Sequence, residues 1–523
     1  MSLAGPGRTH SPVGRNLRSP GSGDGDGHRT AWPTALLARA SAHVEIVVFL
    51  VAVACRLAVV LRSGGLRGDF SYDAPLYFAA SAALIHGRMP YRDFVFLHPP
   101  AQLIVLAPFA ALTGVVSDQT AFMVANLSII GVGATSAVLV VRICRRLGLG
   151  ARASQVGGLC YATWFGSVGA EYLTKLEPVG NLFFLGAVLL ALKASSGPGP
   201  WLWVAAGVAL GVAVCVKIWW IVPAVGVVLW QAIGARQRRG AAIIGAGAVG
   251  AAALVSLPFF VQAPREMWTS VVVNQLGRNR RMDPLPRLRD LATFSRLDDL
   301  PGVALNIGTL GVGLLFLVVV ASAWRARAAR PAVVMLASQL TVLLASPSWF
   351  PYYADYLAGA AAITVAAAAS RPPRRRRVLT AGVCWLPTGM AASVTLAILV
   401  TESVTVRPLP AAAQLSRSVA GLRCVMSDSP MGLIELNALT RGLAAGCANW
   451  IDVTGRTYGP NRSDKPRSQN LGWQRDLTRY LRSGDAIIIL RWRSTGISRA
   501  TYEAISRDGV LARAGGQTVY RVR

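Results

Sequence analysis

The sequence predicts an α-helical protein that crosses a membrane many times and ends in a small α/β domain. Of its 523 residues, 53% are apolar and only 15% are charged, whereas soluble globular proteins carry about 25% charged residues. Lysine supplies 4 of the 53 basic residues, and many of the arginines lie in short runs between apolar stretches. Such runs are typical of membrane proteins, so the net charge of +29 does not indicate a nucleic-acid partner.

Residues 1–43 are rich in Gly, Ser, Pro and Arg, which predicts a disordered cytoplasmic tail. Residues 44–400 form the predicted transmembrane domain, in which several apolar stretches are shorter than the roughly 20 residues of a perpendicular span. We expect eleven stretches to cross the membrane, namely 44–61, 119–141, 153–170, 179–193, 201–216, 218–233, 241–262, 303–324, 331–345, 352–369 and 378–400.

Basic runs set the expected orientation, because basic loops stay on the cytoplasmic side. All four runs and the N-terminus reach the cytoplasm only if the apolar stretch 101–116 lies along the membrane instead of crossing it. The four runs are 142–152, 236–239, 325–330 and 371–377. The outer face then receives the loops 62–118, 171–178, 263–302 and 346–352 and everything after residue 400.

Residues 401–523 predict an extracytoplasmic α/β domain, because short β-like runs alternate with helix-like runs. This alternation favours parallel strands. The β-like runs are 422–427, 486–492 and 518–522, and the helix-like runs are 431–442, 473–482 and 498–507. No Gly-rich phosphate loop precedes a helix here, so a nucleotide site is not expected. Cys424 and Cys447 either form a disulfide or remain two buried thiols.

Polar residues gather in the predicted outer loops, and residues 68–100 hold most of them. Asp73 precedes the helix-like run 74–86 and is expected to be its N-cap. Capping alone would explain this carboxylate, and catalysis is the alternative. The other ionisable side chains that stand out in this loop are Asp69, Asp93, His86 and His98.

Two further outer clusters carry charge. Glu177 precedes Pro178 at the predicted start of a helix, where an acidic residue is favourable in any case. Residues 274–289 carry five arginines on the outer side, against the positive-inside trend. Arginine presents forked donors that fit phosphate oxygens, so this segment is either an anion site or a solvated basic loop. The five are Arg278, Arg280, Arg281, Arg287 and Arg289.

The outer loops resemble those of the GT-C superfamily of glycosyltransferases over about residues 44–370. The first-loop residues that carry the resemblance are Asp73, Tyr77, Ala80, Ala83, Gly87, Pro90, Tyr91, His98, Pro99 and Pro100. The step Glu177-Pro178 and the Gly-rich stretch 207–223 with Lys217 are similar to two further motifs. Residues 346–359 resemble a late motif that often contains His, where this chain has Tyr352 and Tyr353.

The resemblance implies an enzyme that transfers mannose or arabinose from a polyprenyl-phosphate donor to a cell-envelope acceptor. Asp73 would be the general base, with inversion at the sugar, and Lys217 and the 274–289 arginines would stabilise the leaving phosphate. Glu177 would orient the acceptor or, with Asp73, hold an optional Mg or Mn ion. The expected substrate-binding residues are Asp69, Tyr77, Tyr91, Asp93, His98, Lys217, Arg278, Arg280, Arg281, Tyr352 and Tyr353.

Two other functions remain open on the sequence. A transporter or flippase for a lipid-linked sugar would place polar groups near the bilayer midplane, but intramembrane charges are few, and Glu45 and Arg56 are expected near opposite ends of the first span instead of paired. A non-catalytic envelope-assembly protein would use the basic C-terminal domain to bind acidic partners. The excess of Arg over Lys suggests a high-GC bacterium, the resemblance suggests an actinobacterium, and the expected location is the plasma membrane.

Overall fold

The computed structural model describes residues 31–62, 71–197, 199–278, 283–293, 301–370, 377–401, 409–458 and 465–522. Contacts between residues divide the chain into two units, Met1–Val44 and Glu45–Arg523. In the first unit helix α1 begins at Ala31, and it ends in the second unit at Arg62. Residues 1–30 of the predicted disordered tail lie outside the described residues, and the expectation of disorder is wrong for 31–43, which form the first turns of α1.

Each of the eleven predicted apolar stretches contains helix. The longest helices are α1, α4 (Asp118–Arg146), α7 (Leu176–Ser195), α8 (Pro200–Val216), α10 (Arg238–Phe260), α14 (Gly302–Trp324), α15 (Arg330–Ala345) and α17 (Arg377–Thr401). The others are α5 (Ala151–Thr163), α6 (Phe165–Val168), α9 (Ile221–Leu229) and α16 (Ala358–Ala369), with the short turns η2 (Ile218–Trp220), η3 (Trp230–Gly234) and η6 (Arg327–Ala329).

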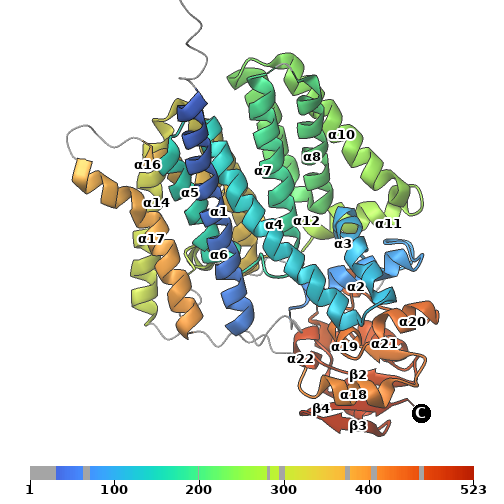
Figure 1. The fold of residues 1–523 in the computed structure, drawn as a ribbon. Coiled ribbons are helices and arrows are strands. Elements are labelled where there is room, and N and C mark those ends of the chain that lie inside the picture. The colour runs from blue at the N-terminus through green and yellow to red at the C-terminus, as the bar shows by residue number, and fades with distance from the viewer. Residues whose placement is uncertain are drawn as a thin grey trace, which may run out of the picture. The chain divides into compact units, whose positions relative to one another are not determined.

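Six of the described helices are long and apolar enough to cross a membrane, and five shorter ones are apolar. Helices α10 and α14 expose large apolar side chains along their length, including Leu254, Leu310 and Leu314, as a helix facing lipid does. Helices α7, α8 and α10 pack side by side in chain order (Figure 1). A polytopic helical fold is therefore confirmed, while the number of eleven spans stays a prediction.

Two predicted spans contain less α-helix than expected. Helix α5 stops at Thr163 because Trp164 adopts an extended backbone conformation (φ −68°, ψ 126°). The stretch 352–369 begins instead with a 3-10 turn, η7 (Pro351–Leu357), and α16 starts only at Ala358. Tyr352 and Tyr353 therefore lie on a tight turn, which is the segment that reaches the candidate site.

The segments between the long helices form a layer of short elements. Helix α3 (Ala101–Ala111) has 11 residues, about 16 Å at 1.5 Å per residue, which is too short for a perpendicular span. That 101–116 does not cross remains a prediction. The other elements of this layer are α2 (Asp73–Ile85), η1 (Leu112–Gly114), α11 (Pro264–Trp268), η4 (Thr269–Val273), α12 (Asn274–Leu276) and α13 (Pro284–Leu291).

The C-terminal domain contains a four-stranded sheet in the order β1-β2-β4-β3. Its strands are β1 (Val425–Ser427), β2 (Ala486–Ile488), β3 (Val510–Ala514) and β4 (Gln517–Arg521). Its helices and turns are α18 (Ala412–Val419), α19 (Pro430–Glu435), α20 (Leu439–Ala444), η8 (Gly455–Tyr458), η9 (Arg467–Gln469), α21 (Leu471–Leu481), α22 (Trp492–Thr495) and α23 (Arg499–Ser506).

The expectation of parallel strands is wrong for two of the three strand pairings in this sheet. Strands β1 and β2 are parallel, but β4 is antiparallel to both β2 and β3. Gly515 and Gly516 both have positive φ and form the two-residue connection that makes β3 and β4 a hairpin, which requires antiparallel pairing. The predicted helix 431–442 is also split into α19 and α20, because Asn437 has a φ of 52°.

The C-terminal domain packs on the start of α4. Asp118, the first residue of α4, accepts the backbone N–H of Leu439 at 2.9 Å, and its own N–H donates to Asn437 Oδ1 at 2.8 Å. Helix α19 contacts both α2 and α4, and side chains such as Phe122 and Leu433 belong to one continuous apolar core. The membrane helices and the C-terminal domain are thus joined by buried polar contacts and by a shared core.

Two charged residues of α1 have partners in segments far along the chain. Glu45 accepts hydrogen bonds from Arg142 and Arg145 near the end of α4, and Arg56 forms a buried ion pair with Glu171. As expected, Glu45 and Arg56 do not pair with each other. Both pairs fasten α1 to its neighbours.

Candidate active site

Asp73 is the first residue of α2. The N-cap is Tyr72, and no side-chain capping bond is present there, so the expectation that Asp73 caps α2 is wrong. Asp73 Oδ2 instead accepts a hydrogen bond from the hydroxyl of Tyr352. The carboxylate remains 24% exposed, which leaves it accessible to a substrate.

Lys175, which the sequence analysis did not single out, is the cation within ion-pair distance of this carboxylate among the described residues. Its Nζ lies 3.7 Å from Asp73 Oδ2, donates to Ser71 Oγ at 3.0 Å and sits 4.5 Å from the centre of the Tyr352 ring. Lys175 precedes α7 and is only 3% exposed. A buried ammonium therefore faces Asp73 from the N-cap position of α7, the helix whose first turn carries Glu177.

Glu177 and Lys217 form a second buried pair. Lys217 Nζ donates to Glu177 Oε1 at 2.5 Å, and it also lies 3.6 Å from the ring centre of Trp219 and 3.7 Å from that of Tyr353. Lys217 is placed there because α8 ends at it and the chain becomes extended. Glu177 Oε2 is buried and has no hydrogen-bond partner among the described residues, so this oxygen retains an unused acceptor position.

The two pairs are linked by the aromatic turn η7. Tyr352 and Tyr353 are adjacent in sequence and pack edge to face, with ring centres 5.0 Å apart. Tyr352 contacts Asp73 and Lys175, while Tyr353 covers Lys217. Tyrosine thus stands where the sequence comparison expected a histidine, and one of these hydroxyls bonds the candidate base.

Arg278, His98 and Tyr77 surround the same space. Arg278 Nη1 lies 3.5 Å from Ser348 Oγ, and its Nε is buried without a partner among the described residues. The His98 ring packs 5.7 Å from Tyr77. Burial, together with the nearby positive charges of Arg278 and Lys217, holds the pKa of His98 well below its ordinary value of about 6.5. His98 is therefore a neutral member of a cationic site at pH 7.

Several expected site residues lie elsewhere. The hydroxyl of Tyr91 donates to the backbone oxygen of His98 at 2.6 Å and so holds the backbone of that residue in place. Asp93 forms an exposed ion pair with Arg92 at 2.8 Å. Asp69, Arg280 and Arg281 lie outside the described residues.

The arginine segment 274–289 does not act as one cluster. The guanidinium of Arg287 is fully buried and donates to the carbonyls of Leu343 and Ser346. Arg289 donates to Asn306 on the surface. The expectation of one joint anion site for these arginines is therefore wrong for Arg287 and Arg289, and Arg278 is the described member that faces Asp73 and Tyr353.

Chemically, the site combines an exposed carboxylate with buried cations. Of the two carboxylates that the structure describes in this site, Asp73 is the one partly open to solvent, and Lys175, Lys217 and Arg278 supply positive charge around it. Such an arrangement suits a reaction that removes a proton at one point and develops negative charge at another. Within the described ranges, no group of three His, Cys, Asp or Glu side chains is arranged to hold a metal ion.

Long-range folding brings to the site four residues that the sequence analysis missed. Lys175 comes from the turn before α7, Ser348 from the turn before η7, and Asp452 and Tyr458 from the C-terminal domain. Lys175 carried one usable signal, because lysine is rare in this chain and this one lies two residues before Glu177 in a predicted outer loop. Asp452 carried none, since no motif surrounds it.

Comparisons with known proteins agree on the fold. Glycosyltransferase family 87 matches this chain over residues 96–347. ArnT from Cupriavidus metallidurans, solved bound to undecaprenyl phosphate, is similar in structure with a TM-score of 0.59 at 16% identity, and the match covers 91% of this chain and 97% of ArnT. The apo form of ArnT gives the same values.

A second similar structure is the archaeal oligosaccharyltransferase AglB from Archaeoglobus fulgidus, in complex with an inhibitory peptide and a dolichol-phosphate. Its TM-score is 0.52 at 12% identity, covering 86% of this chain and 70% of AglB. No curated protein matches the chain. The match to family 87 contains Glu177, Lys217 and Arg278, whereas Asp73 and Tyr352 lie outside it.

Proposed function

We propose that this chain, which matches glycosyltransferase family 87 over residues 96–347 and resembles ArnT and AglB in fold, is a GT-C membrane glycosyltransferase that transfers a sugar from a polyprenyl-phosphate donor to a cell-envelope acceptor. The donor sugar is mannose or arabinose, and transfer takes place at the outer face of a bacterial plasma membrane. The observation that carries this proposal is the partly exposed carboxylate of Asp73, held by Tyr352 beside the buried cations Lys175 and Lys217.

Asp73 is the general base of the proposed reaction. Its carboxylate takes the proton from an acceptor hydroxyl as that oxygen attacks the anomeric carbon of the donor sugar. The bond between the anomeric carbon and the phosphate oxygen breaks, and its electrons leave with the lipid phosphate. One direct displacement inverts the configuration at the anomeric carbon.

Lys217 and Arg278 stabilise the leaving group. A phosphodiester donor carries one negative charge, and the released phosphomonoester carries between one and two at pH 7. Preformed cations lower the barrier most where charge develops. Lys217 shares its charge with Glu177, but Arg278 has a guanidinium nitrogen without a partner, so Arg278 is the stronger candidate for the phosphate.

The solved structures of similar fold support the donor class. ArnT was solved with undecaprenyl phosphate and AglB with a dolichol-phosphate, and both ligands are phosphates on long isoprenoid chains. The exposed apolar faces of α10 and α14 give this chain the lipid contact that such a donor needs. We further propose that the N-terminus is cytoplasmic and that the C-terminal domain is extracytoplasmic, which puts α2 and Asp73 on the outer side.

The test is transfer of radiolabel to envelope lipids in membranes that contain the wild type or Asp73→Asn at equal levels. Polyprenyl-phosphate mannose and polyprenyl-phosphate arabinose are supplied in parallel. We expect transfer from one donor by the wild type, and a loss of about 10²–10⁴-fold in Asp73→Asn. Equal transfer by both proteins would remove Asp73 as the base, and absence of transfer from either donor would contradict the proposed donor pair.

A further inference from the structure

Residues 447–458 form a segment of the C-terminal domain that contacts Tyr72, the residue directly before Asp73. The hydroxyl of Tyr72 donates to Asp452 Oδ1 at 2.7 Å and accepts the backbone N–H of Thr454 at 2.9 Å. Tyr72 is the N-cap of α2. The beginning of α2 is therefore tied to a segment that lies 380 residues further along the chain.

Asp452 is a rigid acceptor, because its own segment also holds it. Asp452 Oδ1 accepts the N–H of Gly455 at 2.6 Å and the hydroxyl of Thr454 at 3.1 Å, and the residue is only 6% exposed. A Cβ at Gly455 would lie 2.3 Å from Asp452 Oδ2, so the backbone fits tightly around the carboxylate. A carboxylate fixed in this way can fix the Tyr72 hydroxyl in turn.

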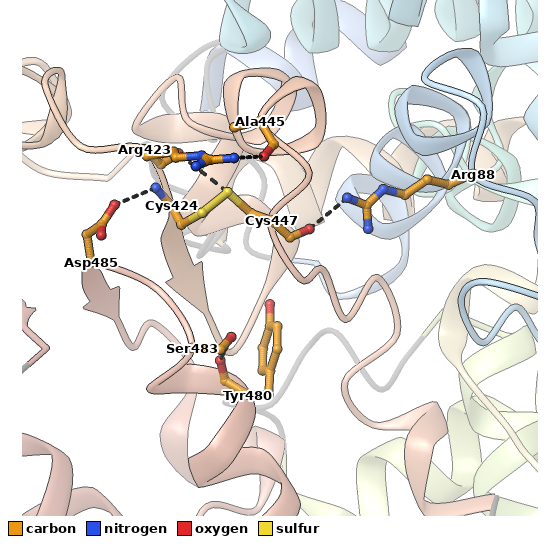
Figure 2. The surroundings of a disulfide bond; sticks show 8 residues. All are labelled: Arg88, Arg423, Cys424, Ala445, Cys447, Tyr480, Ser483 and Asp485. Carbon is orange, nitrogen blue, oxygen red and sulfur yellow. Dashed lines mark hydrogen bonds between the residues drawn. A yellow bond between two sulfur atoms is a disulfide. The ribbon is translucent and has the colours of Figure 1, made fainter.

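A disulfide anchors the start of this segment. Cys447 is bonded to Cys424, with Cα atoms 5.7 Å apart, so the structure contains the first of the two alternatives that the sequence left open. Figure 2 shows Arg88, from the turn after α2, donating to the backbone oxygen of Cys447 at 2.8 Å. It also shows the N–H of Cys424 donating to Asp485, the residue before β2, at 2.7 Å. The segment is thus attached both to the sheet and to the first outer loop.

The other end of the segment reaches the candidate phosphate-binding arginine. The guanidinium carbon of Arg278 lies 5.6 Å from the ring centre of Tyr458, which is the last residue of η8. Residues 447–458 therefore border the site on two sides, with Tyr72 and Asp73 at one point and Arg278 at the other.

We infer that Asp452 is a positioning residue, which holds Tyr72 and thereby orients the Asp73 carboxylate for proton removal. The inference rests on the proposed function, and it makes the C-terminal domain a part of the catalytic unit. The rival explanation is that the Tyr72–Asp452 contact only joins two parts of the protein. The two explanations differ in what they predict for kcat at constant KM, since misorienting a base by a fraction of an ångström slows the reaction without weakening donor binding.

The test uses the full-length chain with Asp452→Asn, Tyr72→Phe and the double variant. Asp428→Asn is the matched control, because Asp428 is also a buried carboxylate of the C-terminal domain but accepts the N–H groups of Leu490 and Arg491 within that domain. We expect each single variant to lower kcat about tenfold with the donor KM within about twofold, and the double variant to lose no more than a single one. Asp428→Asn should retain the wild-type kcat per folded molecule.

Amide hydrogen exchange in residues 451–458 gives a readout that needs no activity. Tyr72→Phe removes the acceptor of the Thr454 N–H, so amide exchange in this peptide should accelerate. The substitution itself lies outside the C-terminal domain, at the N-cap of α2. If the wild type transfers no sugar, the proposed function fails, and the exchange result still decides whether the contact exists. Unchanged exchange, additive losses in the double variant, or an equal kcat loss in Asp428→Asn would overturn the inference.

Discussion

Two buried pairs of acid and cation in this chain differ in how completely their atoms are used. In the Arg56–Glu171 pair, Arg56 also donates to the carbonyls of Ala52 and Ala162, and Glu171 Oε1 accepts the Tyr161 hydroxyl at 2.6 Å. In the Lys217–Glu177 pair, Glu177 Oε2 is left without a partner among the described residues. The first pair is complete, whereas the second is not.

This difference distinguishes a pair that stabilises the fold from a pair with an atom still available to a substrate. A completed buried pair stabilises one packing arrangement and offers nothing to a substrate. Helix α4 passes so close to Glu171 that a Cβ at Gly133 would lie 2.4 Å from its Oε2, which closes that region further. Around Glu177 and Asp73, one carboxylate oxygen is free and one side chain is 24% exposed. The two acids, Glu171 and Glu177, are only six residues apart in the sequence, and only the structure tells their roles apart.

The largest expected effect comes from breaking the complete pair. Arg56→Met leaves the Glu171 carboxylate buried and uncompensated, which should lower the free energy of unfolding by about 3–5 kcal/mol. The measurement is the fraction of protein that remains folded in detergent against temperature. Transfer per folded molecule should stay close to that of the wild type.

The double variant Arg56→Met/Glu171→Met is the control for this prediction. It replaces the ion pair with apolar side chains of similar length, so it should recover much of the lost stability. A double variant less stable than Arg56→Met alone, or a specific loss of transfer per folded molecule, would show that the pair has a role beyond packing.

Substitutions around Asp73 and Glu177 should lower the rate of sugar transfer without lowering the free energy of unfolding. Lys175→Gln keeps a donor for Ser71 but removes the charge that faces Asp73. A charged contact of this kind contributes about 1.5 kcal/mol, so we expect about a tenfold lower kcat. Lys193→Gln, in the last turn of the same helix α7, is the matched control. An equal kcat in the two variants would show that Lys175 does not contribute to the reaction.

A smaller effect should appear in the dependence of stability on pH. Because the pKa of His98 is depressed in the folded protein, the unfolded chain binds the extra proton as pH falls below about 6.5. Stability should therefore be constant above that pH and fall below it, by about 1 kcal/mol at pH 5.5. His98→Gln should flatten this dependence, measured by thermal unfolding at pH 7.5 and 5.5, while the exposed His86→Gln should not. Parallel curves for all three proteins would contradict the account.

The smallest expected effect is that of removing divalent cations. Asp73 and Glu177 each face a lysine ammonium already, which disfavours a second cation between them. Transfer in the presence of EDTA should stay within about twofold of the untreated rate. A loss that Mg²⁺ or Mn²⁺ restores would instead support the metal role that the sequence analysis left open for these two carboxylates.

The fold was largely predictable because apolar stretches and basic runs are local signals. Each predicted stretch contains helix, and the similarity to ArnT confirms the class. The errors fall where local signals are weak. Strand β3 is half-exposed and carries an arginine, so its residues do not form a clear apolar alternation. The turn η7 resembles part of a span in sequence, because it is rich in aromatic residues and is followed by a run of alanines.

The candidate site was predictable only in part. Asp73, Glu177, Lys217 and Tyr352 lie in recognisable sequence motifs, and the structure brings them together. Asp452 could not be found, because its place beside Tyr72 depends on how the C-terminal domain packs, across 380 residues of sequence.

The most direct test of the central claim compares the two pairs in one assay. Purified wild type, Asp73→Asn and Arg56→Met/Glu171→Met are matched for folded protein, and transfer is measured from the active polyprenyl-phosphate sugar. The account predicts that Asp73→Asn folds normally but transfers about 10²–10⁴-fold more slowly, and that the double variant transfers at nearly the wild-type rate. Full transfer by Asp73→Asn, or its loss only in the double variant, would contradict the placement of the chemistry at Asp73.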